Sequence, residues 1–361
     1  MAALRFMVQM RVHNHKVALP VTFPLNAYLL AFCGAGLTAF VGLPLWRRWC
    51  LRVGLVDDPG HRKIHDAPVP LAGGLAVFSG LVVPLVIVAV ALAWQSLVAG
   101  RTGTSASPFP GLFDAQTIDR LTYGFGRRGV QLTAILFGAL GMVVLGWLDD
   151  KHELHPAAKF AGQLTIATLV AAAGLRITVF VPSALFSYLV TVLWILTVTN
   201  AFNFMDNMNG LCAGVGAIGA GAFALIAAIH GQYLVASLAL LVTGALFGFL
   251  PYNFPKATAF LGDAGSHLVG FLLAVLAILP HFYSKKDPDA WAVLTPLVVL
   301  AVPLFDLVWV VGLRWRIGQP FYVGDTNHLS HRLVRRGFSR TNSVVLIWLL
   351  SAAAGLLAFV L

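Results

Sequence analysis

Carboxylate side chains stand at the ends of three long apolar segments in this sequence. The adjacent pair Asp149 and Asp150 closes one segment, Asp206 follows a second, and Asp263 lies in a glycine-rich stretch just before a third. Adjacent carboxylates at the edge of an apolar region repel each other and lose hydration, and a divalent cation or a proton relay would offset both costs. We therefore take these aspartates as candidate catalytic residues, although a solvated acidic turn would also explain the pair.

Amide side chains accompany the second carboxylate at regular spacing. Asn200, Asn203 and Asp206 follow one another in steps of three, which places them roughly along one face of a helix. Amide oxygens and carboxylates are hard ligands suited to Mg²⁺ or to nucleotide hydroxyls. Asn203 and Asp263 are therefore our candidate metal ligands, and Asn200 is a candidate substrate-binding residue. A polar helix cap and turn would explain one or two of these residues, but not the whole run.

Two segments combine groups that bind phosphate. One begins with Arg62, Lys63 and His65, which are followed by prolines and a pair of glycines. A helix that starts at such glycines presents free N–H groups to an anion. The other segment, residues 262–266, sets Asp263 among glycines that let backbone amides approach an anion. An ordinary basic loop and a glycine-rich turn are the alternatives.

Further basic residues lie after the aspartate pair and near the carboxyl end. His328, His331 and Arg332 stand close together and could hold phosphate oxygens, arginine through two N–H groups at once. Lys159 shares a helix face with Gln163, four residues further on. We take His328, His331, Arg332 and Lys159 as candidate substrate-binding residues. Alone, the histidine cluster would be explained as a basic loop with incidental histidines.

The composition indicates what must position these residues. Hydrophobic residues make up 59% of the 361 residues and charged residues only 11%, and the mean hydropathy is +0.84. A soluble domain has about 25% charged residues, so this chain cannot cover a water-exposed surface. The 24 Lys and Arg against 14 Asp and Glu fit cytoplasmic loops beside anionic lipids better than nucleic-acid binding. The scattered cysteines indicate neither a disulfide framework nor a zinc site.

Apolar segments approach the length of about 20 residues that a helix needs to cross a membrane. We expect an all-α integral membrane protein, a polytopic bundle of about ten (10–11) transmembrane helices. Residues 1–23 lack the pattern of a signal peptide and form an N-terminal tail before a single membrane domain, 24–361. The segment 95–130 is the longest predicted loop. The expected spans are 24–46, 71–94, 131–148, 157–174, 185–202, 211–229, 233–250, 267–280, 291–312 and 343–361.

The distribution of Lys and Arg predicts the orientation. The loops are numbered in order, the first one following the first expected span. Most Lys and Arg residues lie in the odd-numbered loops, which places those loops in the cytoplasm and both termini outside. The candidate residues form five motifs, which lie in the same loops or at the helix ends that frame them. These motifs begin at Arg62, Asp149, Asn200, Gly262 and His328. Because alternate loops emerge on one face, we expect the motifs to converge in an active site on the cytoplasmic face. Asp306 lies within a span, where an ionisable residue is a functional candidate, although pairing with a neighbouring helix is an equal alternative.

In their order and spacing, the five motifs resemble those of the polyprenyl-phosphate N-acetylhexosamine-1-phosphate transferases, glycosyltransferase family 4. The resemblance covers most of the chain, from about Asp58 to about Gly337. The segment from Arg62 to Gly74 is more similar to the N-acetylglucosamine branch than to the related muramoyl-pentapeptide transferases. The resemblance implies a multi-pass protein of the bacterial inner (plasma) membrane with its active site facing the cytoplasm.

The resemblance also implies the reaction. GlcNAc-1-phosphate, or another N-acetylhexosamine-1-phosphate, would pass from a UDP-sugar to undecaprenyl phosphate with release of UMP. This would be the first membrane step of a cell-envelope polysaccharide pathway. The cofactor would be Mg²⁺, with Mn²⁺ as a substitute, and the partners would be UDP-N-acetylhexosamine, undecaprenyl phosphate and membrane lipid, without nucleic acid. A homodimer is compatible with this expectation.

The same resemblance assigns roles to the candidate residues. Asp263, with Asn203, would hold Mg²⁺ against the diphosphate, and Asp149 or Asp150 would position the lipid phosphate. Asp206 would contact the nucleotide or the metal shell. The basic groups that would hold phosphate oxygens are Lys63, His328, His331 and Arg332.

Two positions depart from the family pattern and leave alternatives open. Asn209 stands where the family usually has a second aspartate, and Ser330 stands in the middle of the histidine cluster. A muramoyl-pentapeptide transferase and a homologue that binds lipid without turnover are alternatives within the family. A secondary transporter is the alternative from another class, but it would place ionisable residues near the bilayer midplane, where this chain clearly has only Asp306.

Overall fold

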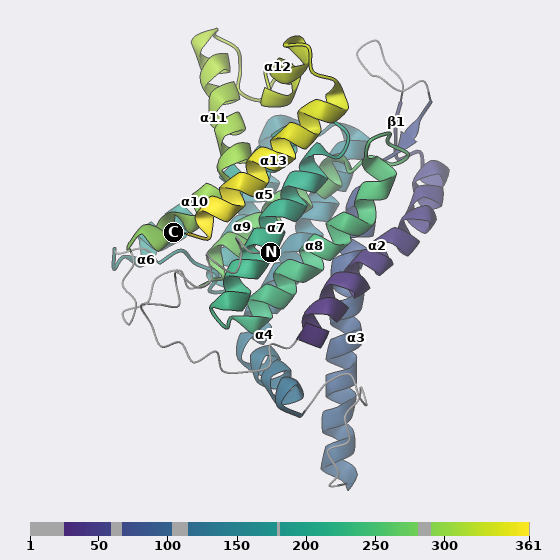
Figure 1. The fold of residues 1–361 in the computed structure, drawn as a ribbon, viewed down its shortest axis with the longest axis vertical. Coiled ribbons are helices and arrows are strands. Elements are labelled where there is room, and N and C mark those ends of the chain that lie inside the picture. Colours follow the sequence, from purple (N-terminus) through teal and green to yellow (C-terminus); the bar gives the residue numbers. More distant parts are fainter. Residues whose placement is uncertain (1–24, 59–66, 103–114, 179–180, 281–289, 361) are drawn as a thin grey trace, which may run out of the picture.

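The computed structural model describes residues 25–58, 67–102, 115–178, 181–280 and 290–360, and these ranges are almost entirely helical (Figure 1). The helices before the middle of the chain are α2 (Leu25–Val53), α3 (Gly73–Thr102), α4 (Ala115–His152), α5 (Pro156–Ala172) and α6 (Ala184–Met205). Those that follow are α7 (Leu211–Ile229), α8 (Tyr233–Asn253), α9 (Gly262–Ile278), η1 (Ala290–Leu294), α10 (Thr295–Val299), α11 (Ala301–Arg316), α12 (Leu329–Arg335) and α13 (Arg340–Ala358).

The helices form a membrane bundle. Seven described helices are long and apolar enough to cross a membrane, or eight if one bent pair counts as a single span. The helices α5 and α9 have 17 residues each and are shorter. Each expected span contains a helix, which confirms an all-α, multi-pass membrane protein. The count of about ten spans stays a prediction.

The predicted loop 95–130 is wrong at both ends. The helix α3 continues to Thr102, and α4 already begins at Ala115. Polar side chains one turn apart stabilise the first part of α4. Arg127, for example, donates to the Tyr123 hydroxyl at 2.6 Å. The guanidinium of Arg120 also lies 5.2 Å from the centre of the Tyr233 ring on α8. The loop was predicted from its polar composition, which does not exclude a helix, and so the end of α3 and the start of α4 were placed wrongly.

The predicted single span 291–312 is broken in the structure. Its apolar parts, Ala292–Val299 and Ala301–Arg316, meet at a bend of 68°. Pro303 has no N–H group to donate to the carbonyl of Val299, so the helical hydrogen-bond ladder cannot run through this point. The bend directs α11 toward α12, which Figure 1 shows beside it at one end of the bundle.

The helix α9 lies at the centre of the bundle. All its residues from Ala264 to Ala277 are buried, and it packs against α3, α4, α6 and α7. A helix enclosed on every side must be apolar all round, which agrees with its sequence. However, α9 begins at Gly262, before the predicted start at residue 267. The glycine-rich motif therefore forms the first turns of this helix, and not a loop before it.

Two glycines let neighbouring helices reach the backbone at the start of α9. A Cβ atom on Gly74 of α3 would lie 2.5 Å from the backbone nitrogen of Gly265. A Cβ atom on Gly146 of α4 would overlap the backbone of Asp263 and Ala264. Only glycine permits such close contact between backbones. The sequence thus fixes α3 and α4 directly against the segment that holds Asp263.

A short ribbon ties the chain before α3 to the same place. Strands β1 (Val56–Asp57) and β2 (Val69–Pro70) pair antiparallel, with Val56 opposite Pro70. The N–H of Phe260 donates to Pro70 at 3.0 Å, and the N–H of Gly73 donates back to Phe260 at 2.9 Å. Figure 1 shows β1 and α12 at the same end of the bundle, with the free ends of α3 and α4 at the other.

The contact between Gly74 and Gly265 can be tested by adding one methyl group. We expect Gly74→Ala to destabilise the protein by about 1–3 kcal/mol, because the methyl group would overpack two backbones that cannot move apart. Thermal unfolding in detergent measures the loss. Gly42→Ala is the matched control in α2, since a Cβ there meets nothing within 4 Å and alanine favours a helix. An unchanged midpoint for Gly74→Ala would contradict this contact.

Candidate active site

The first turn of α9 is capped by a carboxylate from another helix. Asp150, at the end of α4, accepts the N–H groups of Asp263 at 2.8 Å and Ala264 at 3.1 Å. These N–H groups have no partner within their own helix, and a negative charge at a helix start is favourable. Gly262 adopts φ +71° and brings its Cα toward Asp150, where a Cβ would lie 2.7 Å from Oδ2. Asp150 therefore fixes the position of Asp263.

Lys159 joins the other aspartates across three helices. Its ammonium lies 2.6 Å from Asp149 on α4 and 3.0 Å from Asp263 on α9. Asp149 also accepts the N–H of Leu154 at 2.9 Å, which holds the turn between α4 and α5. The candidate substrate-binding residue Lys159 is thus engaged by two carboxylates. Its contact with substrate stays a prediction.

The amide motif continues this network on α6. Asn203 donates its amide N–H to Asp263 at 2.5 Å and to the Ser266 hydroxyl at 3.0 Å. Asn200, one turn earlier, donates to Gln163 of α5 at 2.7 Å. The two asparagines lie one turn apart on α6 but contact different helices. Asn203 contacts α9, and Asn200 contacts α5. Asn203 is beside the aspartates, whereas Asn200 lies one turn further into the bundle.

Asp206 follows the last residue of α6 and differs from the other aspartates. Its carboxylate forms no hydrogen bond with the residues that the structure describes, and it lines a cavity. Burial raises the pKa of Asp206 to about 8, and the negative charges of Asp263 and Asp150 add to the rise. A carboxyl group with a raised pKa in a cavity is a candidate for proton transfer or cation binding.

The aspartates open into a cavity of about 1030 Å³ at this end of the bundle. Asp150, Asp206, Asp263 and Asn203 line it. The described lining does not include Asp149, Lys159 or Asn200. These residues lie behind the cavity wall. The cavity is also lined by cationic side chains that the sequence did not single out, namely Arg47, Lys256 and Arg340. Nothing in their local sequence distinguishes them from other basic residues.

Asp306 pairs with the histidine cluster. Its carboxylate lies 2.7 Å from Nδ1 of His328, and it accepts the N–H of Leu329 at 2.7 Å. Both side chains are buried, and the ring of His328 meets the edge of Phe204 on α6. Of the two alternatives for Asp306, pairing with a neighbouring element is confirmed. His328 is held away from the cavity by this pair.

Of the other residues in the histidine cluster, His331 lines the cavity, and Arg332 and Ser330 contact neighbouring elements. His331 lines the cavity, and burial together with the positive charge of neighbouring side chains holds its pKa below its usual value. The guanidinium of Arg332 lies over the ring of Trp309 at 4.4 Å. Ser330 donates to Asn207 at 2.5 Å, and Asn209 donates to the Pro255 carbonyl at 3.3 Å. These two departures from the family pattern thus join α12 and the loop after α6 to their neighbours.

Arg314 supports the loop before α12 and was not predicted. It is buried on α11, donates to Asp325 at 2.8 Å and to the carbonyl of Phe321, and lies over the ring of Phe204. Arg62, Lys63 and His65 fall outside the described residues. The described residues on either side of them, Asp57 and Pro68, line the cavity.

The donor set fits a magnesium ion that is bound partly by substrate. Four aspartates meet at this end of the bundle, and among the described residues Lys159 is the one cation that contacts them. Among the described residues, no group of three or more His, Cys, Asp or Glu side chains could by itself hold a metal ion. Mg²⁺ usually takes one or two carboxylates and completes its shell with water and substrate phosphates. Asp263 and Asn203 suit that role once the Asn203 amide turns its oxygen inward.

Comparison with known proteins gives the same family on two grounds. The model of glycosyl transferase family 4 matches residues 132–281. A probable undecaprenyl-phosphate N-acetylglucosaminyl 1-phosphate transferase of Bacillus subtilis is 33% identical over 341 residues, covering 92% of this chain and 84% of the relative.

Two further relatives are similar over most of their length. The decaprenyl-phosphate N-acetylglucosaminephosphotransferase of Mycobacterium tuberculosis is 30% identical over 349 residues, which cover 89% of this chain and 79% of that protein. The undecaprenyl-phosphate alpha-N-acetylglucosaminyl 1-phosphate transferase of Escherichia coli is 29% identical over 318 residues, 86% of this chain and 77% of that protein. With the aspartate network at the end of its helical bundle, this chain belongs to glycosyl transferase family 4.

Proposed function

We propose that this protein transfers GlcNAc-1-phosphate from UDP-GlcNAc to undecaprenyl phosphate and releases UMP. A phosphate oxygen of the lipid attacks the sugar-bearing phosphorus, and the bond from that phosphorus to the oxygen of the UMP phosphate breaks. The observation that supports this reaction best is the convergence of Asp150, Asp206, Asp263 and Asn203 in one cavity at the end of a membrane bundle. The names of the relatives agree with it.

The location and charge of the cavity suit these two substrates. UDP-GlcNAc is soluble, whereas the phosphate of the lipid lies at the headgroup plane, so the reaction must occur at a membrane surface. A cavity of about 1030 Å³ is at the upper end of the size range of ligand sites, roughly 300–1000 Å³. Its cationic side chains, Arg47, Lys256 and Arg340, and the ring of His331 provide partners for the phosphates.

The residues have distinct proposed roles. Asp263 and Asn203 would hold Mg²⁺, which supplies neutralisation of the charge that develops on the leaving UMP. Asp150 and Lys159 act on Asp263, one through the start of α9 and the other through its carboxylate. Asp206 is the carboxylate left without a hydrogen-bond partner among the described residues, and we assign it to the lipid phosphate or its proton. This differs from our expectation that Asp149 or Asp150 would position the lipid phosphate, because Asp149 holds the turn between α4 and α5 and Asp150 caps α9.

We also propose that the cavity faces the cytoplasm of the bacterial plasma membrane. Basic residues gather at this end of the helices, as the positive-inside rule requires of a cytoplasmic face. They include Arg47, Arg48 and Arg52 on α2, Lys151 on α4, and Arg314 and Arg316 on α11. The whole of residues 24–361 would form one membrane transferase domain.

The direct test of the reaction is UMP release by the purified protein. We expect release that needs both undecaprenyl phosphate and Mg²⁺, and that stops with EDTA and returns when Mg²⁺ or Mn²⁺ is added. UDP-GlcNAc should be used before other UDP-N-acetylhexosamines and before UDP-MurNAc-pentapeptide. Preference for the muramoyl substrate would move the protein to the other branch. No release with any of these donors would favour a homologue that binds lipid without turnover.

Asp263 provides the sharpest test of a single residue. We expect Asp263→Asn to lower turnover by about 10²–10³-fold or more, the range for loss of one group that stabilises a transition state. The matched control is Asp119→Asn, an exposed aspartate near the other end of α4, which should keep full activity. Both proteins should unfold at the temperature of the unmodified protein. Normal turnover of Asp263→Asn would remove this residue from the reaction.

The pair of Asp306 and His328 should act as one unit. Asp306→Asn and His328→Gln should each lower kcat/KM by roughly tenfold, because either change releases α12 and its His331 from the cavity wall. The double variant should be no worse than the single ones, since residues in one contact are not additive. Steady-state kinetics of the unmodified protein, the two single variants and the double variant measures this double-mutant cycle. Fully multiplicative losses would mean that the two side chains act separately.

A further inference from the structure

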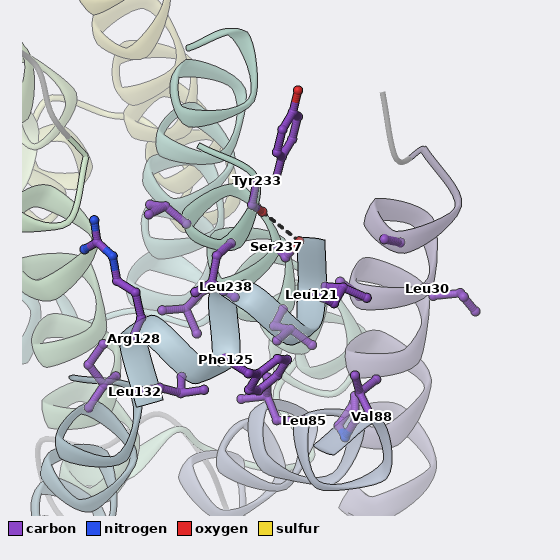
Figure 2. Close-up of a pocket in the computed structure, with 18 of the residues that line it drawn as sticks. Leu30, Leu85, Val88, Leu121, Phe125, Arg128, Leu132, Tyr233, Ser237 and Leu238 are labelled. Carbon is purple, nitrogen blue, oxygen red and sulfur yellow. Dashed lines mark hydrogen bonds between the residues drawn. The ribbon is translucent and has the colours of Figure 1, made fainter. Parts of the chain in front are cut away.

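Two parts of the bundle interior lie apart from the residues that line the aspartate cavity. One is a cavity of about 630 Å³ between α2, α3, α4 and α8, and Figure 2 shows Leu85, Val88, Leu121 and Leu132 around it. Its lining is mainly aliphatic and aromatic, which suits lipid hydrocarbon. The other part lies behind Asp263, where α5, α6 and α9 meet, and it contains polar side chains.

The contacts around Asp263 repeat one turn deeper in the bundle. Lys159 of α5 and Asn203 of α6 both bond to Asp263 of α9. Residues four apart share a helix face, and α6 ends where α5 and α9 begin. The next side chains on these faces therefore lie four residues further along α5 and α9, and four residues back along α6. They are Gln163, His267 and Thr199, which together form the second polar layer.

Contacts with α6 bring the second polar layer together. Gln163 accepts a hydrogen bond at 2.7 Å from Asn200, the residue next to Thr199. A Cβ atom on Gly270, three residues after His267, would lie 2.6 Å from the Cα atom of Thr199. Because glycine permits this close approach of backbones, α9 meets α6 at the same depth as α5 does.

Three polar atoms of the second polar layer form no hydrogen bond with the described residues. They are Nε2 of Gln163, Oγ1 of Thr199 and Nε2 of His267. None of the three residues is more than 1% exposed. A buried polar atom without a partner costs free energy, and native structures contain few of them. Three such atoms from three helices therefore indicate a ligand that bonds to all of them.

The neighbouring hydrogen bonds determine what this ligand must donate and accept. Asn200 donates to the Leu196 carbonyl at 2.8 Å as well as to Gln163, so Gln163 accepts through its oxygen and presents its N–H groups to the layer. Nδ1 of His267 lies 2.5 Å from the carbonyl of Asp263 and donates to it, so Nε2 of the neutral ring is an acceptor. The ligand must therefore accept from an amide and donate to an imidazole.

We propose that Gln163, Thr199 and His267 bind one water molecule, which holds α9 and its Asp263 in place. Water accepts from the Gln163 N–H and the Thr199 hydroxyl and donates to Nε2 of His267, which satisfies all three atoms. An anion would meet no arginine or lysine among these three side chains, and a cation would meet the N–H of Gln163. A small neutral molecule therefore fits the layer best.

The second polar layer reaches the reaction through His267. Its Nδ1 atom holds the carbonyl of Asp263, and the bond from the water to Nε2 fixes the ring. His267 is thus a positioning residue that acts on Mg²⁺ through Asp263, and this role rests on the proposed function, whereas the water site does not. Removing an outer partner of a metal ligand costs roughly 10–100-fold in metal affinity or activity.

Thermal unfolding in detergent tests the water site without any substrate. Thr199→Val removes the hydroxyl at nearly constant volume, and it should lower the midpoint by about 2–4 °C, because the water loses one partner. His267→Leu should lower the midpoint further, since it also removes the bond to Asp263. The double variant should lose less than the sum, because partners of one water are not independent. Additive losses would overturn the shared water.

Two further measurements complete this test. Thr199→Ser keeps the hydroxyl and should restore the coupling to His267, whereas a packing effect would not return with it. If His267→Leu does not fold, Gln163→Met takes its place in the cycle. A cryo-EM map that resolves ordered waters should show one peak between the three side chains. A direct contact among them without that peak would also overturn the proposal.

The Mg²⁺ dependence of UMP release tests the positioning role. Thr199→Val should raise the Mg²⁺ concentration for half-maximal release about tenfold. A purely structural loss would lower the amount of active protein and leave that concentration unchanged, which would refute the role. Thr165→Val is the matched control, because this exposed hydroxyl on α5 donates to the Ala161 carbonyl at 2.8 Å, and it should change neither property. Absence of UMP release by the unmodified protein would refute the reaction, whereas the midpoints alone decide the water site.

Discussion

The start of α9 is the point on which the rest of the structure depends. The first N–H groups of a helix have no partner within the helix itself. Asp150 satisfies two of them from α4. For this contact α4 must end beside Gly262, and the glycines at 74 and 146 must let α3 and α4 touch the backbone of α9. The same requirement fixes Asp263 in the wall of the cavity, so the cap of a helix and the position of this carboxylate have one cause.

Charge then determines which elements gather around α9. Lys159 lies between Asp149 and Asp263, and among the described residues it is the one cation that contacts the four aspartates of the candidate site. Arg47, Lys256 and Arg340 line the same cavity but form no ion pair with these aspartates among the described residues, so the carboxylates would suit a divalent ion. On the other side, Asp306 and His328 form a buried pair that joins α12 to α11. Each contact links two segments far apart in the sequence, and together they shape the end of an otherwise apolar bundle.

The convergence of Asp150, Asp206, Asp263 and Asn203 could be predicted, because loops that alternate across a membrane emerge on the same face. The start of α9 could not be predicted, since its cap residue, Leu261, forms no side-chain cap and the capping carboxylate comes from residue 150. The partners of Asn200 and His328 could not be predicted from sequence either, and the contact of these two residues with substrate stays a prediction. Their residue types suit a substrate, but Gln163 and Asp306 engage them. Spacing along one helix predicts a shared face, and not which neighbour that face will meet.

The length of α4 relates the two ends of the molecule. With 38 residues it is about 57 Å long at 1.5 Å per residue, well beyond the hydrocarbon core. Its apolar part lies between Arg128 at one end and Asp149 at the other. If α4 moved along its axis, one of these charged ends would enter the hydrocarbon, which is costly in either direction. The arginine end therefore holds the aspartates at a fixed height relative to the headgroup plane. A lipid phosphate is confined to that plane, so its access to the cavity that Asp150 and Asp206 line depends on charges a full membrane thickness away.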